Sequence, residues 1–272
     1  MADDLTPHLS EAEEQEVAER SAPQAKIVHA AVVKQGDDEL ARPLGSLFWS
    51  GLAAGITMMA SVSLQAALHR RLPDAPWREL VAGFGYPLGF MIVILGRMQL
   101  FTEQTMVAVL PLMRARTAGN FGRTARLWAV VFVGNVIGAA LIAAACIHLP
   151  LQSKEMTAAM IEVSSKLFEK SAGEILLQGI PAGFLVASIA WIRSATEGGS
   201  FWIVLALTYA IVACGFTHVI AGASEAFLLV WSGHASIGWA AGTFLLPALV
   251  GNIIGGTGLF AMLAHAQVKE EI

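Results

Sequence analysis

The chain has 272 residues, of which 56% are hydrophobic and 14% are charged, and its formal net charge is -4. A soluble domain usually has about a quarter of its residues charged. Several apolar stretches of this chain approach the roughly twenty residues that a helix needs to cross a bilayer. The composition therefore excludes a soluble globular domain and predicts a polytopic integral membrane protein.

The chain opens with an acidic segment, MADDLTPHLSEAEEQEVAER, which lacks the basic-then-apolar order of a cleaved signal peptide. We expect residues 1–43 to form an acidic cytoplasmic tail, residues 44–265 a six-helix membrane domain, and residues 266–272 a short C-terminal tail. Both cysteines, Cys146 and Cys214, lie in predicted spans. They supply neither a disulfide framework nor the spacing of metal ligands.

Six apolar segments are predicted to cross the membrane, at residues 44–68, 80–113, 127–149, 175–192, 201–231 and 239–265. The mixed-charge stretch 152–171 is expected to be a surface helix or loop. The second and fifth segments are too long for one straight crossing, so each is predicted to be broken. With six crossings, both termini lie on the same side of the membrane.

Arginines in short loops indicate which side is cytoplasmic. Five of them lie in loops on the side of the termini, namely Arg114, Arg116, Arg123, Arg126 and Arg193. This distribution favours cytoplasmic termini. Against it, the first turn on the other side holds Arg70, Arg71 and Arg78.

An internal repeat connects the two over-long spans. The second contains Leu100-Phe101-Thr102-Glu103, and the fifth contains Gly215-Phe216-Thr217-His218. A Gly-Asn-x-x-Gly motif follows each, 33 or 35 residues from threonine to asparagine, at Gly134–Gly138 and Gly251–Gly255. Spans one to three thus resemble spans four to six, and three spans per half force the halves to be inverted in the membrane.

A helix that is broken in the membrane leaves backbone groups without partners, so the break must face a cavity or other protein. The two breaks are expected to meet at the midplane and to form a polar point in an apolar tube. Glycines in the Gly-Asn-x-x-Gly motifs allow close helix approach. Asn135 and Asn252 are expected to satisfy the freed backbone groups, and a direct contact with a solute stays open.

At these residues the chain resembles the formate/nitrite transporter family over nearly all of residues 44–265. The matching features are Leu100-Phe101-Thr102, Gly134-Asn135, Gly215-Phe216-Thr217-His218 and Gly251-Asn252-Ile253-Ile254-Gly255-Gly256, in that order. The resemblance implies an aquaporin-like, all-α membrane protein with six transmembrane helices in two inverted repeats. It also implies a homopentamer in a bacterial inner membrane, with one pore per subunit and no cofactor.

Members of this family pass small monovalent anions such as formate, nitrite, lactate or hydrosulfide, often with a proton. By this resemblance, His218 is the central pore histidine and Thr102 is the threonine of the opposing break. The resemblance also implies two apolar constrictions, one formed by Leu100 and Phe101 and the other by Tyr86 and Phe90.

The chain departs from the family pattern at five positions. Glu103 replaces a small hydroxyl residue, and Thr217 stands where many members carry Glu. Gly183 replaces a pore-lining Asn, Arg97 is a charge in an apolar region, and Glu225 is an additional acid. The solute of the best-known members should therefore not be transferred to this chain.

Charges at this depth cost several kcal/mol unless they are paired. Arg97 is therefore expected to pair with Glu103 or, equally, with Glu225, and a direct role of these charges in selecting the solute stays open. Thr102 is expected to cap the broken helix or to donate a hydrogen bond to the solute. A neutral His218 can donate a hydrogen bond or relay a proton, and a protonated anion crosses apolar rings without the cost of a bare charge.

The sequence thus predicts a channel or proton-coupled transporter for a small monovalent anion, with protons and membrane lipid as further partners. One alternative is a pore of the same fold for a neutral or cationic solute, favoured by Glu103 and Glu225. Another is a non-conducting scaffold or sensor that acts through the acidic tail. No catalytic set indicates an enzyme, and nothing indicates a metal site or nucleic-acid binding.

Overall fold

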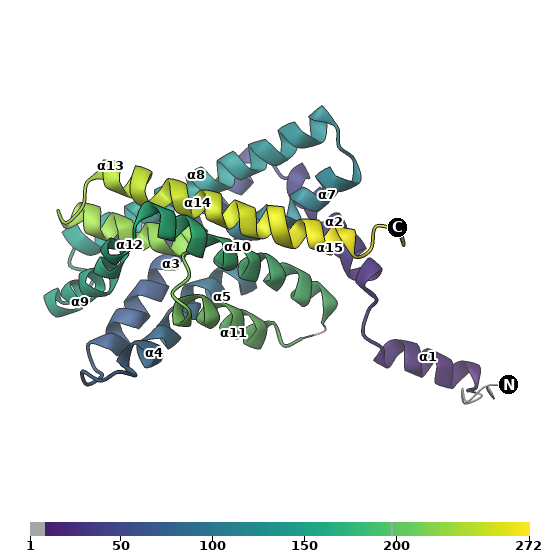
Figure 1. Cartoon of the computed structure of the whole chain (residues 1–272), viewed down its shortest axis with the longest axis horizontal. Helices are drawn as coiled ribbons and strands as arrows, with labels where there is room; N and C mark the ends of the chain where they lie inside the picture. The colour runs from purple at the N-terminus through teal and green to yellow at the C-terminus, as the bar shows by residue number, and fades with distance from the viewer. Residues whose placement is uncertain (1–8, 197) are drawn as a thin grey trace.

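The computed structural model describes residues 9–196 and 198–272, and these residues form helices and connecting turns without a β-strand. Five helical runs are long and apolar enough to cross a membrane: Leu44–His69, Arg78–Leu95, Ala118–His148, Ala172–Ala195 and Ile237–Ala266. The remaining crossing consists of two shorter apolar helices, Ser200–Ala213 and Val219–Trp231. The first described helix, Glu11–Arg20, and the C-terminus lie at the same end of the bundle (Figure 1).

The first half contains the helices from the N-terminus to the third span. They are α1 (Glu11–Arg20), α2 (Ala25–Ala41), α3 (Leu44–His69), α4 (Arg78–Ala82), η1 (Gly83–Gly85), α5 (Pro87–Leu95), α6 (Phe101–Val107), α7 (Val109–Arg114) and α8 (Ala118–His148). The second span is therefore broken between α5 and α6, as its excessive length predicted.

The second half begins after a surface segment formed by α9 (Lys154–Ser164) and the 3-10 helix η2 (Ser165–Glu169). It contains α10 (Ala172–Ala195), α11 (Ser200–Ala213), α12 (Val219–Trp231), α13 (Ile237–Trp239), α14 (Leu246–Ile253) and α15 (Met262–Ala266), with π-helical turns η3 (Ala240–Leu245) and η4 (Ile254–Ala261) on either side of α14. The fifth span is broken between α11 and α12.

The two breaks have the same backbone geometry. Arg97 follows α5 with φ 57°, and Gly215 follows α11 with φ 68°. In each case the next residue closes the helix end: Met98 N–H donates to Val93 O at 2.9 Å, and Phe216 N–H donates to Ile211 O at 2.8 Å. This pattern is the Schellman motif, which needs a left-handed residue and usually has glycine there.

This geometry corrects the register of the internal repeat. Arg97 matches Gly215, so Leu100 matches His218, and each of these precedes the first residue of a half-helix with extended backbone. The alignment of Thr102 with Thr217 drawn from the sequence is wrong by three residues. The Phe-Thr dipeptides of the two breaks occupy different structural positions, because the breaks repeat a backbone conformation and not a residue sequence.

Asn135 of α8 holds the first break. Its Oδ1 accepts a hydrogen bond from Phe101 N–H at 2.9 Å, and its Nδ2 donates to Gly51 O and to Gln99 O, each at 2.8 Å. The side chain is fully buried. It therefore joins the start of α6, the strand-like break and α3 through one amide.

Asn252 of α14 repeats this arrangement at the second break. Its Oδ1 accepts from Val219 N–H at 2.9 Å, and its Nδ2 donates to Gly179 O at 2.8 Å and to Thr217 O at 2.9 Å. Both asparagines satisfy freed backbone groups, as expected, and the donors of both amides are fully used. A direct contact between either amide and a solute is therefore not supported.

Glycines bring each asparagine helix against its neighbour. A Cβ atom on Gly55 of α3 would overlap the carbonyl oxygen of Asn135, and one on Gly183 of α10 would overlap that of Asn252. Close packing therefore requires a glycine at position 183. It lies at a helix crossing where a larger side chain does not fit.

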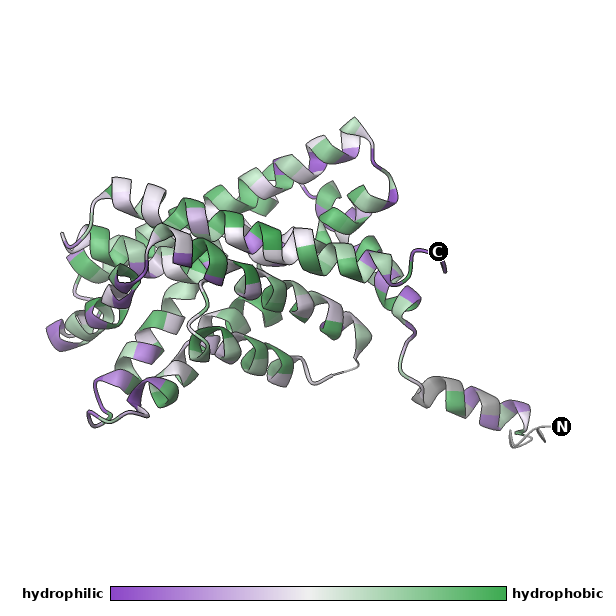
Figure 2. Ribbon diagram, viewed as in Figure 1, coloured by the Kyte–Doolittle hydropathy of each residue, from purple (hydrophilic) through white to green (hydrophobic). Residues whose placement is uncertain are grey.

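Residues of α2 dock on the bundle. Val32 and Val33 are buried in one hydrophobic cluster with Met106, Val107 and Ala187, so this part of the N-terminal region packs against the membrane domain. Figure 2 shows hydrophobic residues along the middle of the bundle, and hydrophilic residues at α9 and at the turn between α3 and α4.

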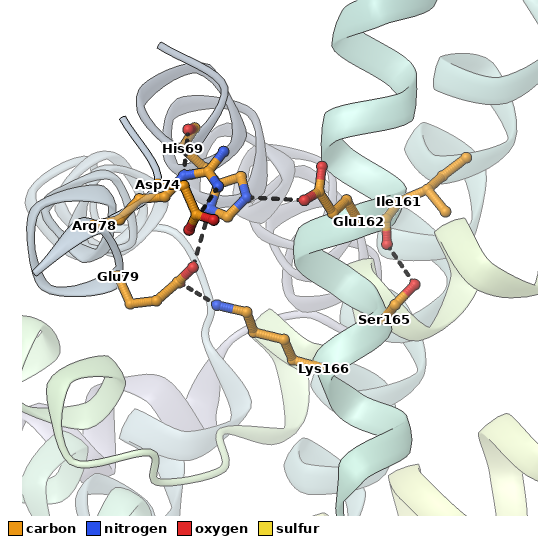
Figure 3. Close-up of polar contacts among 8 residues, drawn as sticks. All are labelled: His69, Asp74, Arg78, Glu79, Ile161, Glu162, Ser165 and Lys166. Carbon is orange, nitrogen blue, oxygen red and sulfur yellow. Dashed lines mark hydrogen bonds and ion pairs between the residues drawn. The ribbon is translucent and has the colours of Figure 1, made fainter. Parts of the chain in front are cut away.

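The end of the bundle away from the termini is held by polar contacts around His69 (Figure 3). The His69 Nδ1 lies 3.1 Å from Glu79 Oε1, and its Nε2 lies 3.2 Å from Glu162 Oε1. Lys166 also pairs with Glu79, and Arg78 donates to the backbone oxygen of His69 at 2.9 Å. These contacts connect α3, α4, α9 and η2.

We expect Asn135→Ala to lower the thermal unfolding temperature of the detergent-solubilised protein, because it leaves Phe101 N–H and Gln99 O without their partner at roughly 1–3 kcal/mol each. The control is Asn120→Ala, since Asn120 is half-buried and makes one side-chain donation, to Ala115 O at 2.9 Å. Equal unfolding temperatures for the two variants would contradict the role of Asn135.

We also expect Gly183→Ala to be destabilised by about 1–3 kcal/mol, because the added methyl group meets backbone that cannot move away. Gly122→Ala in α8 is the matched control, since nothing lies within 4 Å of a Cβ atom there. Its thermal unfolding temperature should be unchanged or slightly raised. A Gly183→Ala protein as stable as Gly122→Ala would show that the helix crossing is not tight.

Candidate functional site

The two breaks bring Thr102 and His218 together at the centre of the bundle. Thr102 Oγ1 lies 2.7 Å from His218 Nε2, and both residues are buried. Thr102 belongs to the first turn of α6, and His218 is the N-cap of α12. The Nδ1 atom of His218 accepts a hydrogen bond from Ala221 N–H at 3.1 Å. Because Nδ1 accepts, the neutral ring carries its proton on Nε2, which then donates to Thr102 Oγ1.

Aromatic and aliphatic side chains surround this pair. The ring of Phe90 packs edge-on to that of His218, with centroids 4.8 Å apart, and Tyr86 lies 5.3 Å from Phe90. Phe90 and Leu100 are fully buried in the same hydrophobic cluster. The hydrogen-bonded pair is therefore a polar point in apolar surroundings.

Phe101 points to a different neighbour. Its ring lies 5.7 Å from that of Trp128 and 5.2 Å from that of Phe132, both on α8. It lines neither of the two cavities described below. Phe101 therefore supports the break from the α8 side, while Leu100 and Phe90 lie between the cavities.

One cavity, of about 210 Å³, opens away from the termini, and we call it the far-side cavity. Tyr86, Thr217, His218 and Glu225 line it, together with Lys166 and Lys170. Three of the predicted site residues that flank the second break, Thr217, His218 and Glu225, are thus brought together at one wall.

Lys170 is a residue that the sequence analysis missed. Its Nζ donates to Gly215 O at 2.7 Å and lies 3.4 Å from Thr217 Oγ1. Burial lowers the pKa of the Lys170 ammonium, and the carboxylate of Glu225 opposes that shift. The sequence does indicate where Lys170 lies, because this residue directly precedes the capping box of Ser171 and Glu174 and therefore the start of α10.

A second cavity of about 210 Å³ lies at the end that carries the termini, and we call it the termini-side cavity. Arg97, Gln99, Glu103, Gln104 and Arg193 are among the residues that line it. Glu103 is buried, with its Oε1 3.6 Å from Arg193 Nη1.

These positions correct the expected ion pairs. Arg97 and Glu225 line opposite cavities, so they do not pair. Arg97 and Glu103 share a cavity, yet no ion pair within 4 Å joins these two described residues, and the partner of Glu103 is Arg193. Arg193, which is predicted from sequence to be a loop residue, lies in the last turn of α10 and faces the bundle interior.

Among the described residues, no group of three or more His, Cys, Asp or Glu side chains is arranged to hold a metal ion. The arrangement is instead two polar cavities, separated by buried Phe90, Leu100, Thr102 and His218. Such a site can bind a small polar molecule at either cavity and can exchange a proton or hydrogen bond with it at His218.

Comparison with known proteins gives one family. The sequence profile of the formate/nitrite transporter family matches residues 26–266. The inner membrane protein YfdC of Escherichia coli K12 is 34% identical over 254 residues, covering 93% of this chain and 82% of that protein. The formate channel BtFdhC of Bacillus thuringiensis is 24% identical, covering 87% of this chain and 93% of the relative.

Two solved structures are similar in fold. An ion channel of the FNT family has a TM-score of 0.72 at 22% identity, covering 89% of this chain and 98% of that chain. A pentameric formate channel with formate bound has a TM-score of 0.70 at 18% identity, covering 84% and 98% of the two chains. At these identities the likeness concerns the fold.

We expect the neutral His218 ring to be the tautomer with a protonated Nε2, because its Nδ1 accepts from Ala221 N–H. The ¹⁵N chemical shifts of labelled histidine in the reconstituted protein, assigned with a His218→Gln variant, would measure this. A protonated Nδ1 and bare Nε2 would contradict the contact described here.

Proposed function

Because this chain belongs to the formate/nitrite transporter family, we propose that it is an inner-membrane channel or proton-coupled transporter for a small monovalent anion. We further propose that it assembles as a homopentamer with one route through each subunit and with cytoplasmic termini. The observation that carries the proposal is the Thr102–His218 hydrogen bond of 2.7 Å between two cavities that open to opposite ends of the bundle.

The apolar barrier explains why a proton is needed. A bare charge in the middle of a membrane costs roughly 3 kcal/mol or more, and Phe90 and Leu100 offer it no hydrogen bond. An anion that takes up a proton beside His218 passes these side chains as a neutral acid. His218 Nε2 and the hydroxyl of Thr102 are the groups placed to hydrogen-bond the solute or to relay its proton.

Two lysines at the far-side cavity can attract an anion. Lys166 and Lys170 line this cavity together with Glu169 and Glu225, and the first turn of α12 directs its backbone N–H groups toward the break, where a helix carries partial positive charge. We propose that Lys170 attracts the anion toward His218.

The alternative of a neutral or cationic solute rested on Glu103 and Glu225. Each of these acids now has a basic neighbour in its own cavity: Arg193 lies 3.6 Å from Glu103, and Lys166 and Lys170 line the cavity of Glu225. Because neither acid presents an isolated negative charge to the route, the anion proposal is favoured.

The test is pH-dependent uptake of formate, nitrite and hydrosulfide into proteoliposomes that contain the purified protein. We expect uptake of at least one of these anions to rise as the pH falls, because more anion is carried with a proton. His218→Ala should reduce this uptake at acid pH by about tenfold or more, the usual scale for loss of a positioned proton donor.

His148→Ala is the control, since His148 is exposed at the end of α8 and its loss should leave uptake unchanged. Uptake of none of these anions by the wild-type protein would contradict the proposed function. Uptake that is equal in wild type and His218→Ala would contradict the role of His218.

A further inference from the structure

The termini-side cavity contains more basic hydrogen-bond donors than the protein satisfies. A recess of about 70 Å³ extends the cavity between Arg97, Glu103, Arg193 and Ser194. Both guanidinium groups and the Glu103 carboxylate line the recess as well as the main cavity. This recess plays no part in the Thr102–His218 contact.

Arg193 is the less exposed member, and it is half-buried. Its side chain is 14% exposed, and its Nε is buried without a hydrogen-bond partner. Its nearest carboxylate, Glu103 Oε1, is 3.6 Å from Nη1, which is an ion-pair distance but longer than a hydrogen bond. A guanidinium group has five N–H donors. Because its Nε has no partner, Arg193 can donate to a further acceptor.

Arg97 is the strained member. It has φ 57°, a left-handed conformation that costs a residue with a side chain about 1 kcal/mol or more. The matching position of the other half is Gly215, with φ 68°. The backbone therefore requires glycine-like geometry at both positions, while the first half places a guanidinium group there, at the exposed edge of the cavity.

Most acids of the cavity are already engaged or lie outside the recess. Glu39 Oε2 accepts from Arg42 at 3.1 Å and from Gln99 Nε2 at 2.7 Å. Asp38 is exposed at the rim of the main cavity. Glu103 is the one acid that lines the recess with the two arginines. The two guanidinium groups thus share one carboxylate, that of Glu103, which lies 3.6 Å from Arg193 Nη1.

We propose that Arg97 and Arg193 form a binding subsite for a small carboxylate anion, and that this anion replaces Glu103 as the partner of Arg193. The proposal rests on the proposed function, because it adds a second anion-binding site to the same transport route. A carboxylate is favoured since the planar guanidinium fork matches two coplanar oxygens. Chloride and hydrosulfide offer no such pair of oxygens.

The first experiment measures formate binding to the detergent-solubilised full-length protein by isothermal titration calorimetry. We expect Arg193→Gln to weaken formate binding by about tenfold or more, because a charge-assisted hydrogen bond is lost. Arg97→Gly should also weaken binding while keeping the thermal unfolding temperature unchanged or raised, since glycine relieves the left-handed strain. Arg123→Gln, an exposed arginine of α8, is the matched control.

Glu103→Gln should act in the opposite direction. Removing the competing carboxylate from Arg193 should tighten formate binding several-fold, whereas general damage to the cavity would weaken it in every variant. Formate affinity that is the same in wild type, Arg97→Gly and Arg193→Gln would overturn the proposal. Weaker binding in Glu103→Gln together with the arginine variants would also overturn it.

A second experiment separates this proposal from the proposed function. Uptake of formate and of hydrosulfide into proteoliposomes is measured for the wild type and for Arg97→Gly, which removes no buried charge. We expect the concentration for half-maximal formate uptake to rise while hydrosulfide uptake is unchanged. If the wild type takes up both anions and Arg97→Gly changes neither uptake, the subsite alone is overturned. If the wild type takes up no anion, the proposed function is overturned.

Discussion

The site depends on two buried amides that complete the hydrogen bonding of two broken helices. Lipid offers no partner to a backbone N–H or C=O group, so a chain can leave helical geometry in the membrane only where protein supplies those partners. Asn135 and Asn252 do this with the same three contacts in each half. Gly55 and Gly183 allow the helices to come close enough for these contacts to form.

Inverted repetition gives the two halves the same backbone but different chemistry. The residue before the first turn of the half-helix is Leu100 in one half and His218 in the other. The left-handed residue is Arg97 in one half and Gly215 in the other. Lysines, Glu225 and His218 therefore line one cavity, and two arginines with Glu103 line the other, so the two ends of the bundle are not equivalent.

The repeat also explains why aligning the two breaks by residue identity gives the wrong register. Phe-Thr occurs in both breaks, and the sequence suggested that these pairs match. The structure instead matches Arg97 with Gly215, because the left-handed turn and the asparagine contacts are what the fold repeats. A left-handed arginine gives no signal in sequence, since the residue usually expected there is glycine.

The sequence by itself determined the membrane class, the six crossings, the broken second and fifth spans, and the role of the two asparagines. These follow from local hydrophobicity, from segment length and from the need to satisfy backbone groups in lipid. Only the tertiary structure decided the pairing of Glu103 with Arg193, the place of Lys170 beside Thr217, and the separation of Arg97 from Glu225. Such contacts join residues that are far apart in the chain, and the side on which a charge lies depends on how the inverted halves pack.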